Sequence, residues 1–135
     1  MGRTYLFVYG TLKSDFGHEM HKHLEMGGQL LGQASCRGKL YLIDWYPALI
    51  PSSDRSDQVH GEVYELLQPE LTLAILDQYE ATSDPPNEKD EYRRQKHEVS
   101  LENGTKLQAW VYWYQQSVHE DRRIHSGIFL PSTSF

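Results

Sequence analysis

Glu80 is the acidic residue whose position most strongly suggests acid–base chemistry. At about 100° per residue, a helix over residues 69–80 places Glu80 on the ridge of Leu73 and Leu76, so its carboxylate is expected to face an apolar surface. Glu80 also falls at the carboxyl end of that helix, where the partial negative charge disfavours another anion. Both effects raise the pKa of a carboxyl group, as a general base near neutral pH requires. A solvated surface glutamate is the simpler interpretation that position alone leaves open.

A second candidate is the turn after the first predicted strand, where the chain reads Tyr9, Gly10, Thr11, Leu12. Glycine lets the backbone turn sharply and approach a ligand, and the amides that follow can point into one concavity. Such amides suit a carboxylate or a developing oxyanion. The spacing is not that of a phosphate-binding P-loop. The pattern is also that of an ordinary turn at the end of a strand.

Three histidines at positions 18, 21 and 23 could be metal ligands by residue type. The zinc motif H-E-x-x-H is absent, because Lys22 stands where its second histidine would be. His18 and His21 can share one face of a helix, whereas His23 points elsewhere. We therefore expect no metal site.

The last predicted strand alternates, with Trp110, Tyr112 and Tyr114 on one face and Val111 and Trp113 on the other. An aromatic stripe of this kind is usually part of a core. The alternative is that one of these hydroxyl groups lines a polar pocket.

Apolar and β-branched runs bounded by turn residues predict six strands, at residues 5–9, 29–34, 39–43, 59–66, 94–101 and 106–115. We expect a turn at Arg37–Gly38, a loop over 51–57 and a type I′ hairpin turn at Asn103–Gly104. A short helix is predicted over 18–26 and ends at two glycines.

The helix over 69–80 is the best defined, since Pro69 suits its first turn and Glu70 its positive end. Leu71, Ile75 and Tyr79 form a second apolar stripe, which leaves the wetter side for Ala74, Asp77 and Gln78. One good helix among many strands predicts an α+β fold with a mostly antiparallel, barrel-like sheet. The length of 135 residues predicts a single domain over 1–135.

Composition excludes several classes of protein. The net charge of −6 argues against binding to nucleic acid, and the apolar runs are too short for a membrane helix. Cys36 is the only cysteine, so no internal disulfide forms; it is expected to be a small buried side chain rather than a nucleophile. No secretory signal opens the chain, and the expected location is cytoplasmic.

Several motifs occur in a specific order over about residues 5–115: F-V-Y-G-T-L-K, G-K-L-Y-L-I-D-W-Y-P-A, V-H-G-E-V-Y-E-L, L-D-Q-Y-E, Tyr92-x-Arg94 and A-W-V-Y. In this order and spacing the chain resembles the γ-glutamylcyclotransferase-like family, which includes AIG2-like and YtfP-like proteins. The resemblance implies a small mixed barrel with flanking helices, an active site at the barrel mouth, and no cofactor.

The resemblance also implies roles for particular residues. Tyr9, Gly10, Thr11 and Leu12 match the loop that holds the γ-glutamyl head group of a small-molecule substrate. Glu80 matches the catalytic glutamate, and Tyr112 is a pocket-wall residue. The expected reaction is cyclisation of a γ-glutamyl amide or γ-glutamylamine to 5-oxoproline, with release of the free amine.

The sequence departs from the family pattern in two places. Where an Asn-His pair commonly follows the loop, only His18 is a rough counterpart. The segment 81–91 is long and acidic, and it is a candidate lid. Because some members lack the glutamate, a non-catalytic binding or regulatory module that uses the same pocket is the alternative, followed by a metal-dependent hydrolase.

Overall fold

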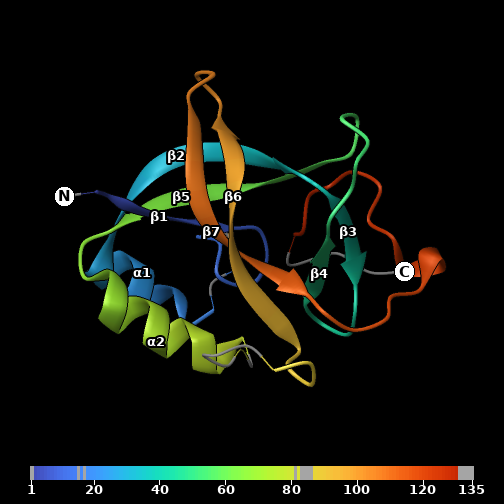
Figure 1. Ribbon diagram of the computed structural model, residues 1–135, viewed down its shortest axis with the longest axis horizontal. Helices are drawn as coiled ribbons and strands as arrows, with labels where there is room; N and C mark the ends of the chain where they lie inside the picture. The colour runs from blue at the N-terminus through green and yellow to red at the C-terminus, as the bar shows by residue number, and fades with distance from the viewer. Residues whose placement is uncertain (1, 15, 17, 81, 83–86, 131–135) are drawn as a thin grey trace.

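The computed structural model shows a five-stranded barrel with two helices packed together on one side of it (Figure 1). It describes residues 2–14, 16, 18–80, 82 and 87–130. The barrel strands are β1 (Thr4–Val8), β2 (Gly28–Arg37), β5 (Gln58–Leu66), β6 (Tyr92–Leu101) and β7 (Lys106–Tyr114). The helices are α1 (His21–Gly27) and α2 (Pro69–Tyr79), and Glu120–Arg122 form a 3₁₀ turn.

The barrel closes in the order β1-β5-β2-β6-β7, as expected for a mixed, mostly antiparallel sheet. Every pairing is antiparallel except that of β1 with β7, where Leu6 lies opposite Trp110. This parallel contact brings the loop after β1 close to the end of β7. The two chain segments that carry the Tyr9–Leu12 turn and Tyr112 are thereby neighbours.

The strands separate two hydrophobic layers because their side chains alternate between faces. Phe7 and Val111 point into the barrel, together with Val63. Leu6 and Tyr112 point outward into a second layer that the helices cover. The alternation predicted for residues 110–114 is therefore confirmed, with each face belonging to a different core.

Helix α2 begins at Pro69 as predicted and ends at Tyr79, one residue earlier than predicted. It buries a narrower stripe than its apolar residues predict. Thr72, Leu73 and Leu76 are buried, whereas Leu71 is 59% exposed. The prediction that Asp77 lies on the wet side is wrong, since its side chain is only 14% exposed. The helix rests on the outside of a curved sheet, so the face turned toward β6 and β7 is buried even where it is polar.

The six predicted strands are all present, with ends that differ by a few residues. A seventh, β4 (Pro47–Ile50), was missed because it is short and begins with proline; it pairs with β3 (Lys39–Leu42) in a separate sheet. The hairpin between β6 and β7 is confirmed, but the predicted type I′ turn at Asn103–Gly104 is wrong. The loop has three residues, because Leu101 N–H bonds to Thr105 O at 2.8 Å. Gly104 takes the left-handed conformation, φ 90°, that such a loop requires.

No helix among the described residues is long and apolar enough to cross a membrane.

Candidate active site

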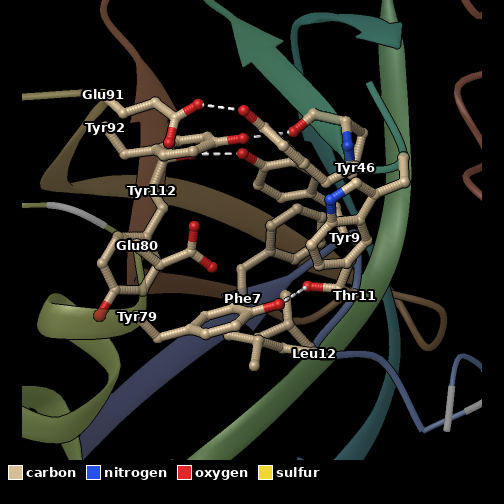
Figure 2. A pocket seen from close by; sticks show the side chains of 14 residues that line it. Phe7, Tyr9, Thr11, Leu12, Tyr46, Tyr79, Glu80, Glu91, Tyr92 and Tyr112 are labelled. Atoms are coloured by element: carbon tan, nitrogen blue, oxygen red, sulfur yellow. Dashed lines mark hydrogen bonds between the residues drawn. The ribbon is translucent and has the colours of Figure 1, made fainter. Parts of the chain in front are cut away.

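A cavity of about 170 Å³ opens where β1 ends, between the end of α2 and the beginning of β6 (Figure 2). The residues predicted from sequence to form a site all line it. Its walls are Phe7, Val8, Tyr9, Gly10, Thr11, Leu12, Trp45, Tyr46, Pro47, Tyr79, Glu80, Glu91, Tyr92 and Tyr112.

The turn after β1 forms one wall and needs glycine at its first bend. A Cβ on Gly10 would lie 2.7 Å from Cγ of Pro47, so no other residue fits without displacing β4. The turn is closed by the Lys13 amide, which bonds to Gly10 O at 3.1 Å. Within the described ranges, the amides of Gly10, Thr11 and Leu12 have no protein acceptor. They remain free to bind an anionic group of a ligand.

Contacts with three other parts of the chain hold this turn in place. Thr11 Oγ1 and the Tyr79 hydroxyl are 2.7 Å apart, which fixes the turn to α2. Just beyond the turn, the Ser14 amide donates to the buried carboxylate of Glu62 on β5 at 2.8 Å. The buried Lys13 ammonium donates to Phe129 O at 2.6 Å. The free amides are thus part of a rigid, well-anchored backbone.

Glu80 is the cap residue of α2, and its amide bonds to Leu76 O at 2.9 Å. Figure 2 shows its carboxylate directed into the cavity, toward Tyr9. Among the residues that the structure describes, that carboxylate has no hydrogen bond or ion pair. Burial raises the pKa of Glu80 to about 8, with smaller contributions from the carboxylates of Glu91 and Asp77. The sequence-based argument predicted this direction, although it did not foresee the two neighbouring acids.

A family model described as "Gamma-glutamyl cyclotransferase, AIG2-like" matches residues 6–130. The chain belongs to this family. A protein of Methanocaldococcus jannaschii, named "Putative gamma-glutamylcyclotransferase", is 30% identical over 116 residues, which are 84% of this chain and 86% of that protein. Membership supports γ-glutamylcyclotransferase activity in general, and with it an enzyme that acts on a small molecule.

Solved structures share the fold. YkqA from Bacillus subtilis is 26% identical with a TM-score of 0.70; the match covers 95% of this chain but only 40% of YkqA. An AIG2-like protein from Mus musculus is 23% identical with a TM-score of 0.63, and the match covers 100% of both chains. The fold predicted from the family resemblance is therefore confirmed.

The far wall of the cavity contains residues that the sequence did not single out. The Tyr46 hydroxyl donates to the Glu91 carboxylate, and the Tyr92 hydroxyl donates to Pro47 O at 2.6 Å. Tyr46, Pro47 and Tyr92 lie inside motifs shared with the family, which was the available signal. The sequence contains no signal that marks Glu91 as a site residue, because Glu91 lies in a segment where acids are common.

Tyr112 lines the cavity, while its polar groups bond to protein partners. Its hydroxyl donates to Asp77 Oδ1 at 2.8 Å, and its carbonyl accepts a bond from the Tyr9 hydroxyl at 2.6 Å. Burial raises the pKa of Tyr9, of Tyr92 and of Tyr112 well above the ordinary value of 10.0. These hydroxyls stay protonated near neutral pH, so they can donate hydrogen bonds but cannot serve as bases.

The three histidines do not form a metal site. The His18 ring stacks on Trp45 with centroids 5.9 Å apart, and His21 Nδ1 lies 2.8 Å from Leu12 O. No group of three or more His, Cys, Asp or Glu side chains that could hold a metal ion occurs in the described part of the chain. His18, the rough counterpart of the family's Asn-His pair, therefore packs beside the cavity as an aromatic ring.

Cys36 is 1% exposed inside the barrel, and burial raises the pKa of its thiol to about 12. This agrees with a packing role rather than a nucleophilic one.

The predicted lid over 81–91 lies partly outside the described residues, which omit 81 and 83–86.

Proposed function

We propose that the protein cleaves a γ-glutamyl amide or γ-glutamylamine to 5-oxoproline and a free amine, with Glu80 as general acid and base. One observation carries this proposal: a carboxyl group with a pKa of about 8 faces a cavity lined by a turn whose backbone amides have no acceptor among the described residues. The carboxyl group can move a proton near neutral pH, and the backbone amides can bind a substrate anion.

The turn amides support a specific placement of the γ-glutamyl head group. Its α-carboxylate would accept hydrogen bonds from the amides of Thr11 and Leu12, which have no other acceptor in the described structure. Among the described residues, the cavity lining contains no lysine or arginine that could compete for this anion. With the carboxylate there, the α-ammonium group would lie toward Glu80.

Glu80 would then take one proton from the α-ammonium group and free its lone pair for attack on the γ-carbonyl carbon. The new carbon–nitrogen bond closes the five-membered ring, and the bond to the leaving amine breaks. Protonated Glu80 gives its proton to the nitrogen of that amine, then takes the second proton from the ring nitrogen and passes it to the amine as well, so the amine leaves as an ammonium ion and the enzyme ends as it began. Because α-ammonium groups titrate above neutrality, a carboxyl group with a pKa of about 8 is a better matched base than an ordinary glutamate.

The aromatic walls would favour ring closure by orienting a flexible chain. Attack within one molecule depends on bringing the amine and the carbonyl together, and good orientation can contribute roughly 7–11 kcal/mol. Phe7, Tyr9 and Tyr92 are buried and fixed by packing or by hydrogen bonds, so they present a rigid surface to the substrate.

The test is 5-oxoproline release from a panel of γ-glutamyl amino acids and γ-glutamylamines by the wild type and by Glu80→Gln. We expect turnover of at least one compound and a loss of about 10²–10⁴-fold in Glu80→Gln. Glu70→Gln is the matched control, since Glu70 is an exposed acid at the other end of α2. Calorimetry that shows binding without turnover would instead support the non-catalytic module, and full activity of Glu80→Gln would contradict the role of Glu80.

A further inference from the structure

Arg94 on β6 forms an ion pair with Asp77 on α2 that the reaction above does not use. Arg94 Nε donates to Asp77 Oδ1 at 2.8 Å and Nη2 donates to Oδ2 at 3.0 Å, a bidentate geometry. The two side chains are only 16% and 14% exposed. The guanidinium group also lies 4.3 Å from the centre of the Trp110 ring. An ion pair this well enclosed is held in one arrangement.

This ion pair joins the elements that form the cavity around Glu80. Asp77 precedes Glu80 by three residues, so the pair fixes the last turn of α2 to β6. Asp77 also accepts the bond from the Tyr112 hydroxyl, which ties the same turn to β7. Through its carbonyl, Tyr112 is bonded to Tyr9 at the binding turn. A change at Arg94 would therefore reach Glu80 through Asp77.

The charges near Glu80 make it important that the negative charge of Asp77 is neutralised. Neighbouring acids are Asp77 from α2 and Glu91 from the segment before β6, and no cation lines the described cavity. Arg94 is the positive group that pairs with Asp77. The other titratable groups around the cavity are the hydroxyls of Tyr9, Tyr46, Tyr79, Tyr92 and Tyr112.

We propose that Arg94 is a positioning residue for Glu80 that acts through Asp77. Its bidentate pair holds the end of α2 on the barrel and cancels the charge of Asp77 beside the general base. The catalytic part of this inference rests on the proposed function; the electrostatic part concerns Glu80 itself and can be measured without turnover.

The test is an NMR titration of the protein labelled with ¹³C at the glutamate carboxyl carbons, with Glu80→Gln used to assign the Glu80 signal. Arg94→Met leaves Asp77 uncompensated, so we expect the pKa of Glu80 to rise by on the order of one pH unit. Asp77→Asn removes an anion and leaves Arg94 in place, so we expect a fall of similar size. Arg93→Met is the matched control, because Arg93 is the exposed neighbour on β6, and it should leave the titration unchanged.

Opposite shifts of the Glu80 pKa in Arg94→Met and Asp77→Asn distinguish this role from a purely structural one, which would shift that pKa in the same direction in both variants. Shifts in the same direction, or no shifts, would overturn the proposal. Should Arg94→Met fail to fold, Asp77→Asn alone must still lower the pKa of Glu80.

Arg94→Lys separates the two parts of the role. This substitution keeps the positive charge and loses the bidentate geometry. We therefore expect the pKa of Glu80 to stay close to that of the wild type and kcat to be about 10-fold lower. A kcat equal to that of the wild type would overturn the positioning part. An active Glu80→Gln enzyme would overturn the proposed function instead, whatever the titrations show.

Discussion

Glu80 is expected to make the folded protein less stable as the pH rises, and its replacement by glutamine should remove this effect. The pKa of its carboxyl group is about 8 in the folded protein against 4.5 for an ordinary glutamate. Between these values the folded chain holds one proton more than the unfolded chain, so stability falls as the pH increases. Each pH unit corresponds to about 1.36 kcal/mol, and the whole window to about 5 kcal/mol. Because Glu80 is half-buried, solvent screens part of the effect, and we expect about 3–5 kcal/mol.

Urea denaturation of the wild type and of Glu80→Gln between pH 4 and pH 9 measures the effect. Below about pH 4.5 the free energies of unfolding should agree, since Glu80 is then protonated in both the folded and the unfolded chain. Above about pH 8 the free energy of unfolding of Glu80→Gln should exceed that of the wild type by the whole of the expected 3–5 kcal/mol. Glu70→Gln loses only a favourable charge at the start of α2, so it should be less stable than the wild type by at most about 1 kcal/mol, with no further change between pH 5 and pH 9. A difference between wild type and Glu80→Gln that does not vary with pH, or a less stable variant at pH 9, would refute the reasoning.

Three further substitutions or measurements test the surroundings of the site. Gly10→Ala forces a Cβ to 2.7 Å from Pro47, and we expect a loss of about 1–3 kcal/mol in the free energy of unfolding, together with weaker binding of 5-oxoproline by calorimetry. Thr11→Val removes the hydrogen bond to Tyr79 and should lower the free energy of unfolding by about 1 kcal/mol in urea; no change would mean that this bond contributes little. Cys36 should resist a thiol reagent at pH 8 in the native protein and react fully in urea, and rapid native labelling would contradict its burial.

The parts of the site predictable from sequence are those with a local signal. Helical periodicity over residues 69–80 was enough to place Glu80 beside an apolar ridge at the end of α2. Alternation along β7 likewise separated the face of Tyr112 from that of Val111. The many predicted strands beside one good helix indicated a barrel-like sheet, and the order of the motifs added the flanking helices and a site at the barrel mouth.

The errors arose where a distant partner decides what a residue does. Asp77 is polar, so periodicity alone assigns it to the solvent side; its burial depends on Arg94, which lies 17 residues further along the chain. Glu91 is one acid among several in its segment, and only the fold brings it to Tyr46, 45 residues away. The sequence contains both partners in each case but does not indicate that they meet.

The parallel contact between β1 and β7 has a consequence for how the protein acquires its site. Tyr9 and the carbonyl of Tyr112, 103 residues apart in sequence, become neighbours only when Leu6 meets Trp110 and the barrel closes. Contacts of such long range slow folding, so we expect a partly folded chain to lack the complete cavity. A compound that binds the cavity should therefore protect the whole barrel against unfolding, rather than one loop, and its binding would report on the completion of folding.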